Sequence, residues 1–294
     1  MADAIGNKAA KDYHLDIPAE NRAFFAKGLG NTDWGMKNRV SRLFNPKSGN
    51  TVMLAFDHGY IMGSTAGLER LDVTIAPLAQ YADVLMGTRG AIRSCIPPET
   101  DKAICLRATH DSSVLFEDMS RGNGLALDME DALRMNAAAL AVQCFIGGEG
   151  EAASLESLCR ACDAGYRYGV PVLGVTAVGK EMARTTQYFL LATRILAELG
   201  ASAVKTYYCD DFEKVVAACP VPIVIAGGKK LPEAEALTMA WRAMQDGARG
   251  VDMGRNIFQS EHPAAMCQAV RAIVHDGASD KAAYELYLEL ANAQ

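Results

Sequence analysis

The chain has 294 residues, half of them apolar, so it can bury a large hydrophobic core, and its length exceeds that of a usual single domain. Its formal net charge of -6, with a pI near 5.5, argues against nucleic acid or an anionic membrane as a partner. Residues 1–16 lack the apolar stretch of a secretory signal, and no charge-free run reaches the roughly 20 residues that span a bilayer. We therefore expect a soluble, cytoplasmic protein.

Eight cysteines are scattered along the chain, and several, such as Cys105 and Cys144, lie inside apolar runs. Without a secretory signal, this distribution predicts reduced thiols and not a disulfide framework. Cys159 and Cys162 form a single CxxC motif in a helical run, with no second pair to complete a zinc site. The histidines show no metal-ligand spacing either, so we expect no metal.

The chain begins with a polar, glycine-bearing arm over residues 1–33, followed by a short helix predicted over Trp34–Phe44. From there, strand-like runs that end in glycine or a polar residue alternate with helical runs of 3.6-residue spacing. The eight predicted strands are Thr51–Phe56, Ala82–Met86, Ala103–Arg107, Ala139–Ile146, Val172–Ala177, Ala203–Tyr207, Pro222–Ala226 and Gly250–Met253. Most are continuous apolar runs, as expected for a parallel sheet that is covered on both faces.

Single strands separated by single helices imply right-handed βαβ crossovers, and eight such units favour a closed (β/α)8 TIM barrel over an open sheet. No glycine fingerprint of the dinucleotide-binding type follows the first strand, which also weighs against the open sheet. The interval around His110–Asp128 is the least regular and can carry extra structure. Residues 277–294 form a helical tail, with the final helix over Tyr284–Leu290. The whole chain, 1–294, is thus predicted to be one barrel domain.

Lys205 is the strongest candidate for a catalytic residue, because it lies inside the predicted strand Ala203–Tyr207. Alternation places Ala203, Lys205 and Tyr207 on one face of that strand. One interpretation is a structural lysine that is paired with a core carboxylate, because a lysine is almost never fully buried without a partner. The other is a lysine in the mouth of the barrel, where desolvation favours the neutral, nucleophilic amine. We favour the catalytic interpretation.

Asp57, His58 and Gly59 directly follow the first predicted strand, at the end of the barrel where active sites lie. Taken singly, Asp57 could cap a helix and His58 could be a packed imidazole. Together with a buried lysine, they indicate proton transfer and substrate orientation. An ionised Asp57 would oppose deprotonation of Lys205, so desolvation or a second cation, such as Lys229 or Arg107, has to offset it.

Two glycine-containing loops follow the seventh and eighth strands, where many barrels bind phosphate. They are Gly227-Gly228-Lys229 and Gly254-Arg255-Asn256. Glycine lets backbone N–H groups approach an anion, and a short helix that begins there adds its dipole. The glycines could instead do no more than end the strands. Because each loop also carries a cation, we predict a phosphate site.

Asp252 is a carboxylate inside the otherwise apolar eighth strand. It could pair with Lys205 or with Arg107, or it could belong to a polar layer inside the barrel. The sequence leaves these possibilities open.

Five short motifs, spread from Asp33 to the end of the barrel, carry a resemblance to a known family. They are Asp33-Trp34-Gly35-Met36, Leu54-Ala55-Phe56-Asp57-His58-Gly59-Tyr60, Lys205-Thr206-Tyr207-Tyr208, Ile225-Ala226-Gly227-Gly228-Lys229-Lys230 and Gly254-Arg255-Asn256-Ile257-Phe258-Gln259. These motifs resemble the DeoC/FbaB aldolase family over nearly the whole chain. The glycine–cation loops are shared across that family. The first and third motifs point to its thiolase branch, which acts in autoinducer-2 breakdown.

The resemblance implies a barrel with a Schiff-base lysine at Lys205 and a phosphate site at Gly227, Gly228, Gly254 and Arg255. It implies a phosphorylated 3-hydroxy-2,4-dione as the substrate and coenzyme A as the acetyl acceptor, with no bound cofactor. Lys205 would form an iminium at the ketone nearer the phosphate, and the coenzyme A thiolate would attack the other ketone. The resemblance also implies a homo-oligomer, for which a decameric ring is one form.

The chain departs from one branch of the family at the fifth strand. Archaeal-type fructose-bisphosphate aldolases place a catalytic tyrosine at the end of that strand, whereas this chain has the small residues of Gly174-Val175-Thr176-Ala177-Val178-Gly179. This weakens plain aldolase chemistry and favours His58 over a tyrosine as the acid or base.

Two other functions stay open. A class I aldolase would cleave a sugar phosphate and release an aldehyde without coenzyme A. A non-catalytic phosphosugar-binding barrel would use Lys205 only as an ion-pair partner, and borohydride reduction would then add no covalent mass.

Overall fold

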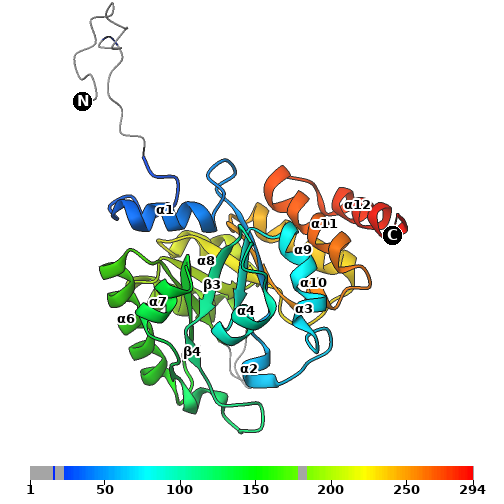
Figure 1. Ribbon diagram of the computed structural model, residues 1–294. Helices are drawn as coiled ribbons and strands as arrows, with labels where there is room; N and C mark the ends of the chain where they lie inside the picture. Colours follow the sequence, from blue (N-terminus) through cyan, green and yellow to red (C-terminus); the bar gives the residue numbers. More distant parts are fainter. Residues whose placement is uncertain (1–15, 17–22, 178–183, 294) are drawn as a thin grey trace, which may run out of the picture.

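The computed structural model describes residues 16, 23–177 and 184–293. Eight parallel strands close into a barrel with helices around it (Figure 1). The strands are β1 (Thr51–Ala55), β2 (Val84–Gly87), β3 (Ala103–Arg107), β6 (Ala139–Cys144), β7 (Val172–Thr176), β8 (Ala203–Tyr207), β9 (Ile223–Ala226) and β10 (Gly250–Met253). They follow one another around the barrel in chain order, and β10 closes it by pairing with β1. The TIM-barrel prediction is therefore confirmed.

Alternation along each strand divides the apolar residues between two cores. One core fills the barrel and contains Ala203 and Val224, whereas the other lies between the strands and the helices and contains Val204. In the register, Val175 and Val224 flank Lys205 on the neighbouring strands. Lys205 thus lies on the inner face that alternation predicts, together with Ala203.

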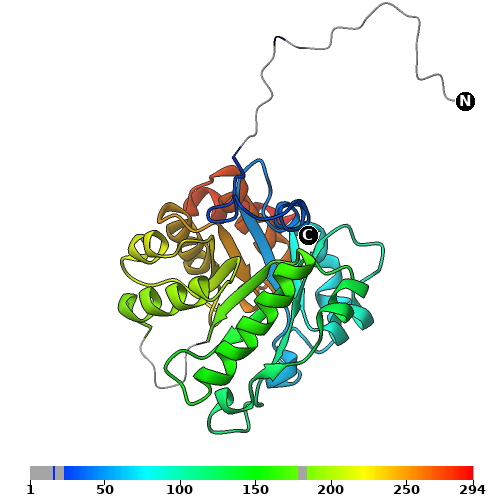
Figure 2. The same ribbon diagram turned by 90° about the vertical axis from the view of Figure 1, so that its left-hand side faces the viewer.

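The helices cover the outside of the barrel, as Figure 2 shows for α6 across β6 and β7. The helices of a full turn or more are α1 (Trp34–Leu43), α2 (Gly59–Met62), α3 (Leu71–Thr74), α4 (Arg89–Cys95), α5 (Met129–Arg134), α6 (Glu151–Tyr168), α7 (Thr186–Glu198), α8 (Phe212–Ala218), α9 (Glu233–Gln245), α10 (Arg255–Phe258), α11 (Pro263–Asp276) and α12 (Asp280–Asn292). A 3-10 helix, η1, spans Ala76–Tyr81. Among the described residues, no helix is both long enough and apolar enough to cross a membrane.

Helix α1 closes the end of the barrel at which the strands begin. Its buried residues Met36, Val40 and Leu43 belong to the same core as the barrel-filling Met53 and Ala103. Asp33 caps this helix by accepting from the backbone N–H of Met36 at 2.7 Å. The opposite end of the barrel, where α2 lies in Figure 1, is therefore the open one.

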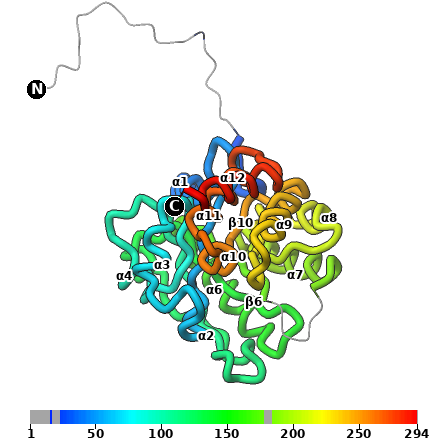
Figure 3. Tube along the Cα trace, turned by 90° about the vertical axis from the view of Figure 1, so that its right-hand side faces the viewer, coloured from blue at the N-terminus to red at the C-terminus, as the bar shows by residue number. Residues whose placement is uncertain are grey.

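The irregular interval after β3 does carry extra structure. It forms a two-stranded antiparallel sheet from β4 (Thr109–His110) and β5 (Gly124–Leu125), with the 3-10 helix η2 (Met119–Gly122) between them. The final helix is longer than predicted, because Ser279 caps it by accepting from the backbone N–H of Ala282. This helix, α12, packs against α9 and α11 on the outside of the barrel (Figure 3).

Some predicted boundaries differ from the structure by one or two residues. Strand β1 ends at Ala55, although the backbone N–H of Phe56 still donates to the carbonyl of Met86. All eight cysteines are free thiols, as the sequence predicted. Most of the N-terminal arm lies outside the described residues.

Candidate active site

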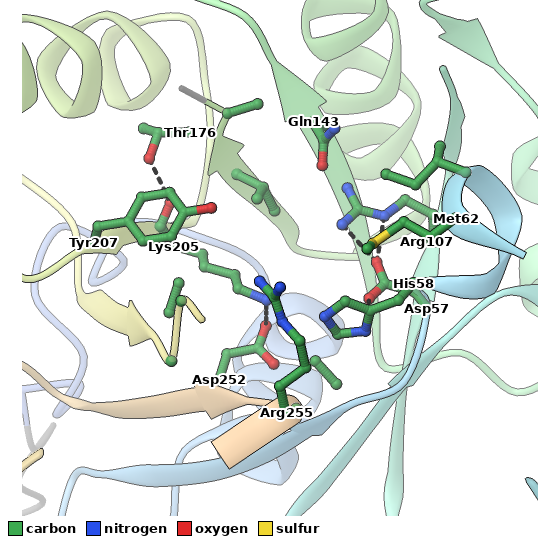
Figure 4. A pocket seen from close by; sticks show the side chains of 18 of the residues that line it. Asp57, His58, Met62, Arg107, Gln143, Thr176, Lys205, Tyr207, Asp252 and Arg255 are labelled. Carbon is green, nitrogen blue, oxygen red and sulfur yellow. Dashed lines mark hydrogen bonds and ion pairs between the residues drawn. The ribbon is translucent and has the colours of Figure 1, made fainter. Parts of the chain in front are cut away.

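A pocket opens at the end of the barrel where the strands terminate (Figure 4). Most of the predicted site residues line it together: Asp57, His58, Lys205, Gly227, Gly228, Gly254 and Arg255. Lys205 lies in β8, and the others lie in the segments that directly follow β1, β9 and β10. The sequence therefore predicted where most of the site lies.

Lys205 pairs with Asp252 across the barrel interior. Its Nζ lies 2.9 Å from Oδ2 of Asp252, whose side chain is fully buried. This contact decides the question that the sequence left open, in favour of Lys205 over Arg107 as the partner of Asp252. Burial raises the pKa of Asp252, and the charge of Lys205 offsets this only in part. Because Lys205 also lines the pocket, it is both an ion-pair partner and a group that a substrate can reach.

Asp57 forms a buried ion pair with Arg107. Its Oδ2 accepts from Arg107 Nε at 2.7 Å and lies 2.5 Å from Arg107 Nη2, and both side chains are buried. Burial alone would raise the pKa of Asp57, but the charge of Arg107, aided by His58 and Lys205, outweighs it and lowers this pKa to about 2. Asp57 is therefore ionised at neutral pH and neutralised by a partner, which favours orientation over proton transfer as its role. Arg107 is also one of the cations that the sequence suggested to offset Asp57.

His58 is the better candidate for moving a proton. Burial lowers its pKa to about 4, with further lowering by Lys205 and Arg255 against the opposing effect of Asp57. The imidazole is therefore neutral at pH 7 and can accept a proton. Its Nδ1 is buried, has no hydrogen-bond partner among the described residues and lies 3.9 Å from Asp57 Oδ1. Its ring packs edge-on against Phe258 at 5.8 Å between centroids.

The two glycine loops form one unit, because Asn256 joins them. Its Nδ2 donates to the carbonyl of Gly227 at 2.6 Å, and its Oδ1 accepts from the backbone N–H of Leu231 at 2.7 Å. Gly228 has a positive φ of 68°, which favours glycine. A Cβ at Gly254 would lie 2.4 Å from the carbonyl oxygen of Ala55, so a side chain cannot fit there. These glycines keep both loops close to the pocket.

The two cations of these loops, Arg255 and Lys229, differ in their position relative to the pocket. Arg255 lines the pocket, and its Nε is buried without a hydrogen-bond partner in the described part of the chain. Lys229 is exposed and does not line the pocket, although its backbone carbonyl accepts from Asn256 Nδ2 at 3.2 Å. The prediction that Lys229 binds the phosphate is not supported by this placement. A second arginine that sequence reasoning did not select, Arg184, lines the pocket instead, 4.1 Å from the ring of Tyr207.

Sequence reasoning also missed a polar network beside the pocket. Asp111 accepts from the hydroxyl of Tyr60, from Gln143 Nε2 at 3.0 Å and from Asn123 Nδ2 at 2.6 Å. Burial raises the pKa of Asp111. Tyr60 directly follows the Asp57-His58-Gly59 motif, which was the available signal, whereas Asp111 lies in the interval that the sequence left irregular.

The end of the fifth barrel strand is small, as predicted. Val175 and Ala177 line the pocket, and the hydroxyl of Thr176 lies 2.9 Å from that of Thr206, between the strands. Residues 178 and 179 of the predicted motif lie outside the described residues. Tyr207, from β8, is the tyrosine that borders the pocket nearest to Lys205 in sequence.

The model of the DeoC/LacD family of aldolases matches residues 51–260, which include the whole barrel. The chain belongs to this aldolase family. It is 55% identical over 289 residues to the 3-hydroxy-5-phosphonooxypentane-2,4-dione thiolase of Escherichia coli K12, covering 98% of this chain and 99% of the relative. An uncharacterized aldolase of Pasteurella multocida is 56% identical over 290 residues, with the same coverage.

Solved structures show the same fold. An archaeal fructose 1,6-bisphosphate aldolase superposes with a TM-score of 0.73 at 24% identity, over 83% of this chain and 100% of that one. A fructose-bisphosphate aldolase from Slackia heliotrinireducens gives a TM-score of 0.76 at 18% identity, over 87% and 90% of the two chains. At these identities, the likeness supports the barrel fold alone. Within the described residues, no three His, Cys, Asp or Glu side chains gather as a metal-binding set.

Proposed function

We propose that this enzyme is a thiolase that cleaves 3-hydroxy-5-phosphonooxypentane-2,4-dione with coenzyme A, giving dihydroxyacetone phosphate and acetyl-coenzyme A in autoinducer-2 breakdown. The observation that carries the proposal is the full-length identity of 55–56% to relatives that bear this thiolase name. The pocket supports it, because a buried lysine faces the space where a ketone would bind.

In this proposal, Lys205 is the Schiff-base lysine. Its amine attacks C4 of the dione, the ketone nearer the phosphate, and loss of water leaves an iminium. Coenzyme A attacks C2 as a thiolate, and the C2–C3 bond then breaks. The electrons of that bond pass into the iminium and form an enamine of dihydroxyacetone phosphate, while C2 leaves as acetyl-coenzyme A. Protonation at C3 and hydrolysis release the second product and Lys205.

The neighbours of Lys205 have supporting roles. His58 is neutral at pH 7 and is the proton carrier, while Asp57 orients Arg107. Arg255 and the backbone of Gly227, Gly228 and Gly254 bind the phosphate, because Arg255 Nε, which has no partner among the described residues, offers a charged donor beside these loops. Coenzyme A is a co-substrate, and the reaction needs no bound cofactor.

The setting and assembly belong to the same proposal. Eight free cysteines fit a reducing, cytoplasmic compartment. Large apolar side chains stay exposed at several places, including Trp34 at 78% and Leu115 at 91%. Such surfaces mark protein contacts in many proteins, so we place this chain in a homo-oligomer, with a decamer as one form.

The deciding experiment mixes the enzyme with the dione, with and without coenzyme A, and follows both products by mass spectrometry. We expect acetyl-coenzyme A and dihydroxyacetone phosphate in equal amounts, with no cleavage when coenzyme A is left out. Rapid, coenzyme A-independent cleavage of fructose 1,6-bisphosphate, with no acetyl-coenzyme A from the dione, would establish the aldolase instead. Borohydride reduction in the presence of dihydroxyacetone phosphate should add the ligand mass to the peptide containing Lys205. A protein that only binds phosphosugars would gain no mass.

A further inference from the structure

One nitrogen of Arg107 has no partner in the part of the chain that the structure describes. Its Nε and Nη2 face Asp57 at 2.7 and 2.5 Å. Its Nη1 is buried and has no hydrogen-bond partner among the described residues, and the whole side chain is only 5% exposed. A buried donor without an acceptor destabilises the fold, and the cost is larger when the donor is charged. Because Arg107 lines the pocket, a ligand atom can supply the missing acceptor.

The guanidinium group is held firmly in place. Asp57 fixes one edge of it, and the ring of Tyr60 lies 5.6 Å from its Cζ. Tyr60 is itself anchored by its hydrogen bond to Asp111. Burial disfavours the charge of Arg107, but Asp57, Tyr60 and Asp111 outweigh burial and raise its pKa, so it stays a cation. A fixed cation needs no reorganisation when negative charge develops beside it.

Arg107 and Lys205 lie on different sides of the same pocket (Figure 4). The proposed substrate has two ketones separated by a single carbon, so both cannot bind to Lys205. If Lys205 holds C4, the oxygen on C2 needs a different partner. We infer that Arg107 Nη1 is that partner, and that it stabilises the oxyanion that forms when the thiol adds to C2. This inference rests on the proposed function.

The electron movements are balanced in this step. The sulfur of deprotonated coenzyme A forms a bond to C2, and the π electrons of that carbonyl move to its oxygen, beside Arg107 Nη1. When the C=O bond forms again, the C2–C3 bond breaks and its electrons neutralise the iminium on Lys205. The proton that the thiol lost is matched by the proton that C3 gains.

Stabilisation of the C2 oxyanion by Arg107 is a role that acyl transfer needs and aldol cleavage does not. In a retro-aldol reaction, no nucleophile adds to a carbonyl at the cleaved bond; a base takes the proton of a hydroxyl as the C–C bond breaks. Thiol addition to the C2 ketone instead turns a carbonyl oxygen into an oxyanion before the C–C bond breaks. A fixed, unpartnered donor opposite the Schiff-base lysine is therefore what the thiolase reaction requires.

The test is Arg107→Lys, which keeps a positive charge beside Asp57 but removes Nη1. We expect kcat for acetyl-coenzyme A formation to fall by about 100- to 1000-fold, the usual loss for one oxyanion donor, with little change in KM for the dione. Borohydride trapping of dihydroxyacetone phosphate on Lys205 should persist, because iminium formation does not use Arg107. Arg121→Lys is the matched control, since Arg121 is exposed and pairs with Glu149 on the surface, and its kcat should match that of the wild type.

Three outcomes would overturn the inference. One is a kcat for Arg107→Lys within threefold of the wild type. Another is a raised KM with unchanged kcat, because Arg107 would then anchor the phosphate. The third is loss of trapping together with cleavage in a folded variant, because Arg107 would then act on Lys205. A wild-type enzyme that makes no acetyl-coenzyme A would instead refute the proposed function itself, before any variant is compared.

A second comparison covers the case in which Arg107→Lys does not fold. In the double variant Asp57→Asn/Arg107→Gln, two amides replace the buried ion pair, and Asp57→Asn alone is the reference. A loss of 100-fold or more in kcat relative to the reference, with trapping retained, supports the oxyanion role. A kcat within threefold of the reference refutes it.

Discussion

The ion pair between Lys205 Nζ and Asp252 Oδ2, at 2.9 Å, joins two strands that are not neighbours in the sheet. Strand β9 lies between β8 and β10, so the two side chains meet inside the barrel. The ion pair agrees with the interpretation of Lys205 as a structural lysine paired with a carboxylate. Its position in the pocket lining agrees with the interpretation of Lys205 as a catalytic lysine. Stability and activity should therefore respond differently when the pair is changed.

Lys205→Ala and Lys205→Arg should both abolish turnover and borohydride trapping, measured as acetyl-coenzyme A formation and peptide mass. Alanine lacks the amine, and guanidinium stays protonated and cannot form an imine. Both variants should still bind inorganic phosphate through Arg255. Substantial turnover in either variant would rule out Lys205 as the Schiff-base residue.

The contribution of the Lys205–Asp252 ion pair to folding stability can be measured separately from the catalytic role of Lys205. Asp252→Leu should destabilise the fold by about 3–5 kcal/mol, because it leaves Lys205 as a buried cation without its partner. The double variant Lys205→Met/Asp252→Leu should recover that loss and be at least as stable as the wild type, while remaining inactive. Urea denaturation of the two variants and the wild type gives the comparison. A double variant that is no more stable than Asp252→Leu would show that the pair is not an independent unit.

Arg255→Ala should lower kcat/KM for the phosphorylated dione roughly 10- to 150-fold, because it removes one charge-assisted contact. This factor corresponds to a loss of about 1.5–3 kcal/mol in transition-state stabilisation. Lys229→Ala is the matched control, because Lys229 lies in the neighbouring loop but outside the pocket, and it should stay within threefold of the wild type. With a dephosphorylated dione, Arg255→Ala should cause little further loss. Equal impairment of both substrates would exclude Arg255 from phosphate binding.

The fold and the place of the site could be predicted from the sequence because both depend on chain order. Eight apolar runs separated by helices define a barrel, and a residue directly after a strand, such as His58 or Arg255, must lie at its open end. The pairings could not be predicted. Whether Asp252 meets Lys205 or Arg107 depends on the tilt of the strands and on side-chain directions across the barrel. The sequence likewise could not show that Lys229 is exposed outside the pocket, because Lys229 and the pocket-lining Gly228 are adjacent in the same loop.

The last prediction concerns His58 and pH. Burial lowers its pKa in the folded protein to about 4, whereas the pKa of an unfolded histidine is about 6.5. Between these values the unfolded chain binds a proton that the folded protein does not, so the folded state loses stability as the pH falls from about 6.5 to about 4. From pH 7 to pH 5, this contribution amounts to about 2 kcal/mol. The variant His58→Gln lacks it but keeps the other histidines, so the wild type should lose about 2 kcal/mol more than the variant in urea denaturation at the two pH values. The lowered pKa of Asp57 does not interfere, because it affects stability only below pH 4.

The low pKa of His58 also predicts that kcat shows no loss from protonation of His58 between pH 7 and pH 5.5. Equal pH dependence of stability in the two proteins would show that His58 titrates normally, and its assignment as a proton carrier that is neutral well below pH 6 would then fail.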